Sequence, residues 1–441
     1  MKKKIMIAVL VFAMFVSAHG FYIDLQNTRD YFAIDLRNRV VGARLIENGI
    51  DPYFFKWNDS YPEELLDPRD DYSVVVSRVT VPPTVLFLYS FIRDLPYSSQ
   101  KYLWLFLQWM ALIISTWLLA RKAGSSNKCM IVWIIGLLVV SGNLMWRFHV
   151  ERGQLYIFYV LLFAISYYLF DSKSKRKEMI SGLIIGFTAA LRPTAILMVI
   201  PALSLRKYRF VVSTLIGCMS TVGVTMLTHG VSSWKSFLSA MSIHGLVHIG
   251  AIERLGVRLS KSTVEGIAWN GPNGLFPFPD IDSSFQELFS LCGFQIEQTY
   301  LLLLLGVLCC SIYLYCRNIN EPIPNHLYFL IGVLLVLLAE YLLPAARFPY
   351  NDVFWLLPLS LIVRGSDAVK PTSLVILSLI ILSSFSWAIK YYMDLICSCT
   401  MPSMSAIVGL TYLAEVTMPI IMVWVAWIMV KSHQNQSELR V

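Results

Sequence analysis

Long apolar runs, separated by short basic segments, make up most of the 441-residue chain. A helix needs about 20 predominantly apolar residues to cross the hydrocarbon core of a bilayer. The runs therefore predict an all-α polytopic membrane protein with about 12 transmembrane helices. The expected spans lie near residues 5–22, 101–120, 129–147, 155–170, 178–191, 194–204, 210–229, 299–316, 327–344, 353–364, 371–391 and 407–430.

Basic residues predict the orientation of these spans. If the spans alternate in direction, the clusters at 2–4, 121–128, 173–177 and 206–209 and the basic residues after 316, 363 and 430 share one side. Lys and Arg concentrate in cytoplasmic loops of membrane proteins. We therefore expect both termini to be cytoplasmic.

Two apolar segments do not fit simple alternation. Counting Val81 to Leu95 as a crossing would move every later basic cluster outside, so we expect a re-entrant or interfacial helix there. The runs 178–191 and 194–204 are short and are separated by Arg192-Pro193. They predict either two tilted half-length helices or one broken helix that lines a cavity.

The N-terminal segment resembles a secretory signal, with three lysines before an apolar run. The run continues to Tyr22, which favours an uncleaved signal anchor over a cleaved signal peptide.

Two long polar stretches, 24–80 and 231–297, are expected on the extracytoplasmic side of a single membrane-embedded domain that covers residues 1–441. A transporter needs a path through its helix bundle, whereas an enzyme needs a site at one face. Two long loops on the same side favour the enzyme, and a secondary transporter or a flippase for lipid-linked sugars is the alternative.

Composition limits the function classes further. With 56% hydrophobic and 15% charged residues, the chain differs from soluble globular proteins. Its net charge of +8 is explained by topology, so we expect no nucleic-acid partner. The eight cysteines show no CxxC pair and predict no metal site. One disulfide could form among Cys292, Cys397 and Cys399.

An acidic residue begins the first predicted loop helix. Residues 35–48 have the pattern of an amphipathic helix, and Gly49 is suited to end it. Asp35 at its start could accept a proton from an alcohol at the membrane surface. The alternative is that Asp35 caps the helix and interacts with its dipole.

Several cations occur where the positive-inside rule does not explain them. Arg147 and Arg152 flank His149 and precede Gln154, Arg192 ends an apolar run, and Arg347 lies on the expected outer face. Arginine binds phosphate well, and intramembrane ionisable residues usually have a function. The alternatives are an Arg–Glu surface network around residue 150 and snorkelling of Arg347 to lipid head groups.

Two histidines, His244 and His248, are spaced to share a helix face. No third ligand accompanies them, so contact with substrate or solvent is favoured over a zinc site. Glu340 and Glu415 lie in or near spans and could be proton-relay acids of a transporter or groups that pack between helices.

The order of these features resembles glycosyltransferase family 87. The features are Asp35, then Gly49 to Tyr53, then Pro82-Pro83, Leu103-Trp104, Gly153-Gln154, Gly182-x-x-x-Gly186 and Arg192-Pro193. The chain departs from the family pattern at Tyr156, where Asn is common, at Arg192, where Lys is more usual, and at Pro344 to Tyr350, which lacks a His.

The resemblance implies the C-type glycosyltransferase architecture and a polyprenyl-phosphate sugar donor, with mannose as the expected sugar. It implies a glycan or glycolipid acceptor and no cofactor. Asp35 would be the general base, and Arg192, with Arg147, Arg152 and Arg347, would bind the donor phosphate. Gln154, His149, Tyr53, His244 and His248 would contact substrate. A polysaccharide polymerase or ligase on the same scaffold is a further alternative.

Overall fold

The computed structural model describes residues 2–30, 33–172, 174–259, 263–268, 282–294, 296–319, 323–343, 345–384 and 404–438. Within them the helices are α1 (Lys2–Thr28), α2 (Ile34–Glu47), α3 (Pro83–Tyr89), α4 (Tyr97–Arg121), α5 (Ser126–Ile134), α6 (Leu144–Arg152), α7 (Tyr156–Phe170), α8 (Lys175–Leu191), α9 (Val199–Ser204), α10 (Tyr208–His248), α11 (Phe285–Leu291), α12 (Gln298–Arg317), α13 (Asn325–Leu342), α14 (Leu356–Gly365), α15 (Pro371–Ser383) and α17 (Met404–Glu438).

Shorter elements connect them. The 3-10 helices are η1 (Glu63–Leu65), η3 (Pro193–Met198), η4 (Pro349–Trp355) and η5 (Ser366–Ala368), and η2 (Ile135–Val140) is a π-helix. Strands β1 (Thr263–Val264) and β2 (Ile267–Ala268) form a small antiparallel hairpin. The predominantly helical fold agrees with the sequence-based expectation.

Six described helices are long and apolar enough to cross a membrane, and a seventh span results if the bent pair α5–η2 and α6 is counted. The chain is therefore a multi-pass membrane protein. The expected count of about twelve spans is not confirmed. Helices α7 and α15 have 15 and 13 residues, short of a full crossing. Apolar content alone does not distinguish such packed helices from complete spans.

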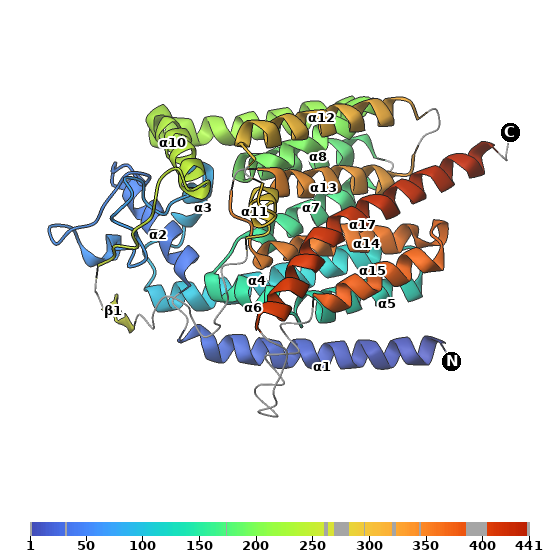
Figure 1. The fold of residues 1–441 in the computed structure, drawn as a ribbon, viewed down its shortest axis with the longest axis horizontal. Coiled ribbons are helices and arrows are strands. Elements are labelled where there is room, and N and C mark those ends of the chain that lie inside the picture. The colour runs from blue at the N-terminus through green and yellow to red at the C-terminus, as the bar shows by residue number, and fades with distance from the viewer. Residues whose placement is uncertain are drawn as a thin grey trace.

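The ends of the bundle differ in character. Helix α2, helix α3 and the β-hairpin lie at one end, and both chain termini lie at the other (Figure 1). Basic connecting segments contact acids that are distant in sequence: Lys122 lies 3.2 Å from Asp171, and Lys128 lies 2.7 Å from Asp367. Arg364 also pairs with Asp171, at 2.8 Å. These ion pairs join three helix connections, and the orientation of the spans across the membrane stays a prediction.

Helix α10 is longer than the sequence indicated. The polar stretch expected from residue 231 begins with helix, because α10 continues to His248 after a kink at Gly230, where φ is 80°. The second half of α10 packs on the first loop (Figure 1), with Phe237 and Ala240 against Tyr53 and Leu86. Apolar contacts with the loop thus stabilise a helix in a stretch that reads as polar.

The expected span 129–147 is broken. Helix α5 passes into the π-helix η2, and α6 follows at an angle of 64°. Within residues 81–95, where we expected a re-entrant or interfacial helix, the structure has the seven-residue helix α3, with Pro83 at its start. The break before α6 directs residues 147–152 toward the first loop, where the candidate site lies.

Candidate active site

The first turn of α2 positions Asp35. Ala33, just before the helix, has a left-handed backbone with φ of 52°. The hydroxyl of Tyr97 donates a hydrogen bond to the Ala33 carbonyl oxygen at 3.0 Å and stabilises this turn. The Asp35 side chain remains 19% exposed, so its carboxylate is accessible to a ligand.

Gly153 brings a second segment to Asp35. It ends α6 with φ of 68°, and a Cβ atom here would lie 2.6 Å from the Leu36 Cβ. Only glycine adopts this conformation readily and permits so close an approach to α2. The absent side chain therefore lets the next residue, Gln154, reach Asp35.

Gln154 connects Asp35 to Arg39. Its Nε2 donates to the Asp35 Oδ2 at 2.6 Å, and its Oε1 accepts from an Arg39 terminal nitrogen at 2.8 Å. Arg39 also donates to the Gly153 carbonyl oxygen at 3.0 Å. These bonds fix which end of the Gln154 amide faces the carboxylate.

The other Asp35 oxygen faces Arg78. An Arg78 terminal nitrogen lies 3.6 Å from the Asp35 Oδ1, and the other lies 3.9 Å from the Asp67 Oδ2. Both contacts are long for ion pairs, and the Arg78 side chain is 19% exposed. Arg78 can therefore interact with a ligand beside Asp35.

Arg192 lies at the end of α8 and is held by its Nε atom. The Nε donates to the Glu340 Oε1 at 2.5 Å, from helix α13. The guanidinium carbon lies 4.4 Å from the Tyr156 ring centre and 5.5 Å from that of Tyr159. Among the described residues no hydrogen bond or ion pair involves the two terminal nitrogens of Arg192, and the side chain is 20% exposed.

A row of aromatic rings connects the segments. Tyr350 lies 5.6 Å from Tyr156 and 5.2 Å from Phe148, between ring centres. The Arg152 guanidinium lies 4.7 Å from the Phe148 ring centre. Rings from α6, α7 and η4 thus lie between Arg152 and Arg192.

The other two predicted phosphate ligands are neutralised inside the protein. Arg147 pairs with Asp24 of α1 at 2.5 Å and donates to the Ser141 carbonyl oxygen at 2.8 Å. Arg347 pairs with Asp352 at 2.5 Å and with Glu415 at 2.9 Å. Their bonds to these acids hold helices together and leave them unavailable to a substrate in this structure.

The predicted substrate contacts are dispersed. His149 is buried, with Gln108 near its Nδ1 and the Ile157 amide bonded to its Nε2. Tyr53 is buried and donates to the Val81 carbonyl oxygen at 3.0 Å. His248 lies 3.5 Å from Asp282. Of the five residues named for this role, Gln154 alone contacts Asp35 within the described part of the chain.

His244, the fifth of them, lies on the second half of α10, and its Nε2 is buried with no hydrogen-bond partner among the described residues. The described residues contain no group of three or more His, Cys, Asp or Glu arranged to hold a metal ion. Cys292 is a free thiol, while Cys397 and Cys399 lie outside the described residues.

Four residues at the site were not identified from the sequence as contributors to it: Arg39, Arg78, Tyr350 and Tyr159. A helical pattern could have indicated Arg39, because it follows Asp35 by four residues and so shares its face. Arg78 and Tyr350 follow no local pattern that marks them.

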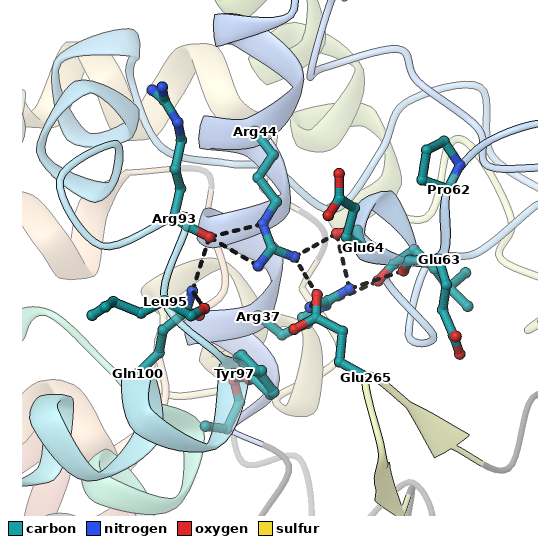
Figure 2. A network of polar contacts seen from close by, with 12 residues as sticks. Arg37, Arg44, Pro62, Glu63, Glu64, Arg93, Leu95, Tyr97, Gln100 and Glu265 are labelled. Atoms are coloured by element: carbon teal, nitrogen blue, oxygen red, sulfur yellow. Dashed lines mark hydrogen bonds and ion pairs between the residues drawn. The ribbon is translucent and has the colours of Figure 1, made fainter.

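The helix that carries Asp35 is held by the second loop. Figure 2 shows the Glu265 carboxylate between Arg37 and Arg44 of α2, with Arg37 at 2.7 Å. Burial alone would raise the pKa of Glu265. The charges and hydrogen bonds of Arg37 and Arg44 have the larger effect, so the pKa of Glu265 is lowered. Glu265 and Gly266 both have positive φ, as a two-residue hairpin turn requires. The tight turn thus presents this carboxylate to α2.

The family model of glycosyltransferase family 87 matches residues 80–273. The match includes Gly153, Gln154 and Arg192, and it ends before Glu340. Asp35 lies on the N-terminal side of the matched range. No curated protein matches the chain. The family match supports the assignment to glycosyltransferase family 87 and indicates a membrane glycosyltransferase.

Proposed function

We propose that the protein transfers a sugar, with mannose as the expected one, from a polyprenyl-phosphate donor to a glycan or glycolipid acceptor on the extracytoplasmic face of the inner membrane. The observation that carries the proposal is the contact of Gln154, inside the family match, with the carboxylate of Asp35. In this proposal the partly exposed Asp35 and Arg192 belong to one site, because Tyr350 lies near Asp35 and its ring is 5.6 Å from that of Tyr156, which contacts Arg192.

Asp35 acts as the general base in this proposal. Its Oδ2 is oriented by Gln154, and its exposed edge can accept the proton of an acceptor hydroxyl. The acceptor oxygen forms a bond to the anomeric carbon while the bond from that carbon to the phosphate oxygen breaks. The bonding electrons leave with the phosphate, the proton goes to Asp35, and the configuration at the sugar carbon inverts.

Arg192 stabilises the departing phosphate. Arginine can bind a phosphate through two parallel N–H donors. Glu340 and the rings of Tyr156 and Tyr159 hold the guanidinium by its Nε and its face, so that both terminal nitrogens remain for the phosphate. Because this preorganised cation can stabilise the developing negative charge, the proposed mechanism requires no metal. Arg152 lies at the other end of the aromatic row and is not assigned to the donor phosphate in this proposal.

The test is a transfer assay with the full chain in lipid nanodiscs, a labelled polyprenyl-phosphate mannose and a panel of glycan acceptors. We expect Asp35→Asn to abolish transfer while the donor still binds. Asp59→Asn is a matched control, because Asp59 is an exposed acid of the same loop. Full activity of Asp35→Asn would refute the assigned base. Absence of transfer to every acceptor, with movement of the labelled lipid across the membrane of proteoliposomes that contain the chain, would instead support the flippase alternative.

A further inference from the structure

Five arginines gather beside Asp35 on the side of Arg78. The first loop contributes Arg69 and Arg78, the end of α6 contributes Arg152, and the second loop contributes Arg254 and Arg258. We call these five residues the arginine group. It does not include Arg192, which has a different set of neighbours, namely Glu340, Tyr156 and Tyr159.

Backbone contacts between the two loops bring the group together. The Tyr72 amide donates to the Val257 carbonyl oxygen at 2.8 Å, and the Leu255 amide donates to the Ser73 Oγ at 3.0 Å. The extended segment 254–258 therefore runs along residues 72–73. This alignment places Arg254 and Arg258, one at each end of the segment, close to the arginines of the first loop.

The cations in this region repel one another. Burial and the charges of Arg78, Arg258 and Arg152 lower the pKa of Arg69 to about 10. Burial and the charge of Arg78 also lower the pKa of Arg254, and the opposing effect of Asp71 and Asp70 does not reverse this shift. Like charges disfavour the charged form of a neighbour. The protein therefore keeps these arginines together at an electrostatic cost that a bound anion would offset.

The local acids compensate the group only in part. Asp67 favours the charged form of Arg69, and Asp71 and Asp70 favour that of Arg254, yet the net pKa shift of both arginines is downward. Lys56 forms an ion pair with Asp70, and its Nζ lies 3.0 Å from each carboxylate oxygen. Asp71 accepts from the hydroxyl and amide of Ser73. Within the described residues, Arg152, Arg254 and Arg258 form no ion pair within 4.0 Å. The arginine group and Lys56 are six cations, and they outnumber the five nearby acids, which are Asp35, Asp67, Asp70, Asp71 and Glu151.

We propose that the arginine group binds a phosphate-type anion, phosphate or pyrophosphate, that belongs to the acceptor. This inference rests on the proposed function. In an in-line displacement, the leaving phosphate lies on the face of the sugar carbon opposite the attacking hydroxyl, which must be at Asp35. Arg192 suits the leaving phosphate. The arginine group touches Asp35 through Arg78 and so lies where the acceptor enters.

The binding test uses the purified full chain in a non-ionic detergent and inorganic pyrophosphate as the probe. A ligand that binds the folded state raises the unfolding temperature in a concentration-dependent way. We expect pyrophosphate to stabilise the wild type beyond sodium chloride at equal ionic strength. The double variant Arg254→Gln/Arg258→Gln should weaken this binding at least about tenfold. Arg209→Gln/Arg317→Gln removes the same charge from two exposed arginines outside both loops and should have no effect.

The site would be overturned if pyrophosphate stabilised the wild type and the Arg254/Arg258 double variant equally. It would also be overturned if pyrophosphate did not stabilise the wild type. The source of the anion is tested separately with dihexanoyl phosphatidylglycerol, a soluble lipid with a head-group phosphate. We expect little competition with pyrophosphate. Strong competition would assign the site to bilayer head groups and overturn the acceptor assignment.

The transfer assay separates this inference from the proposed function. The Arg254/Arg258 double variant should raise KM for a phosphate-bearing acceptor about tenfold or more and leave KM for the donor unchanged. A rise in donor KM instead would show that the group binds the donor. Asp35→Asn should lose transfer but still bind pyrophosphate. If Asp35→Asn transfers sugar normally while pyrophosphate binding behaves as expected, the proposed base is wrong and the anion site stands.

Discussion

The side-chain amide of Gln154 donates a 2.6 Å hydrogen bond to the carboxylate of Asp35, across 119 residues of sequence. The same amide accepts from Arg39, so Gln154 is held at both ends. The carboxylate, its orienting amide and the arginine behind it therefore form one connected unit. If Asp35 is the base, its geometry depends on Gln154.

Gln154→Leu tests this dependence. The change keeps the approximate size of the side chain but removes the bonds to Asp35 and Arg39, so we expect kcat to fall about 100-fold, within the range for a positioned proton acceptor. Donor KM should change little. Steady-state kinetics in nanodiscs measure both, and Gln26→Leu, an exposed amide of α1, is the control. A Gln154→Leu protein with normal kcat would show that orientation of Asp35 is unimportant.

Gly153→Ala tests the close approach of α6 to α2. The added Cβ would be strained by φ of 68° and would also lie 2.6 Å from the Leu36 Cβ. Gly250→Ala is the matched control, because φ there is 74° and no atom lies within 4 Å of the added Cβ. We expect Gly250→Ala to cost about 1–2 kcal/mol of stability and Gly153→Ala about 1–3 kcal/mol more.

Thermal unfolding in detergent measures the two glycine variants, and the transfer assay follows their activity. The structure predicts loss of activity for Gly153→Ala alone, because a shift between α2 and α6 would separate Gln154 from Asp35. Equal behaviour of both variants would mean that backbone strain, and not the contact with Leu36, governs the effect.

Local pattern was sufficient to find the helix that carries Asp35. The amphipathic period and Gly49 predicted a helix over residues 35–48, and α2 covers Ile34–Glu47. The amphipathic period depends only on residues of the same helix, because positions on one helix face recur about every 3.6 residues. The number of spans could not be obtained in the same way, because short buried helices such as α7 are as apolar as complete spans.

Pairings over long sequence distances could not be predicted. Arg147 seemed an unpaired cation because its partner, Asp24, is distant in sequence. Arg347 has a partner five residues away, Asp352, and a second one, Glu415, that is distant in sequence. Arg192 is likewise separated from Glu340 by 148 residues. Each of these distant pairs forms only when segments far apart in the sequence pack, and the sequence of either segment carries no sign of its partner. Buried charges are nevertheless expected to be paired, so a cation of this kind indicates an acid somewhere in the fold.

Glu340→Gln tests how Arg192 is held. The amide cannot pair with the guanidinium as a charge, so Arg192 should lose its fixed direction relative to Tyr156. We expect kcat/KM for the donor to fall about 10- to 100-fold, equal to about 1.4–2.8 kcal/mol. Glu340→Asp should recover part of this loss. Acceptor KM, measured in the same assay, should stay unchanged, and an equal rise in both KM values would indicate a general packing defect.

Arg192→Lys tests whether the forked side chain is required. Lysine retains the charge but has no Nε for Glu340 and no pair of parallel donors for a phosphate. We expect donor kcat/KM to fall at least about tenfold, with acceptor KM retained. Arg209→Lys, at an exposed position, is the control for the substitution itself. Wild-type kinetics of Arg192→Lys would show that charge alone suffices there.

The ion pair of Glu265 with Arg37 and Arg44 predicts a pH dependence of stability. The arginines lower the pKa of Glu265 in the folded protein below its ordinary value of 4.5. The folded state therefore favours the carboxylate, and this contribution is fully present above the ordinary pKa. It is lost as the pH falls through the lower, folded-state pKa. Thermal unfolding between pH 7 and pH 3 should show the loss.

Glu265→Gln should remove this acid-sensitive contribution and destabilise the protein at pH 7 by about 1–3 kcal/mol, as expected for hydrogen bonds to charged groups. Glu63→Gln is the control, because Arg37 contacts the Glu63 carbonyl oxygen and not its side chain (Figure 2). Below the folded-state pKa the difference between wild type and Glu265→Gln should shrink. If the difference instead stays constant down to pH 3, the carboxylate charge does not hold the hairpin on α2, and its hydrogen bonds alone would account for the contact.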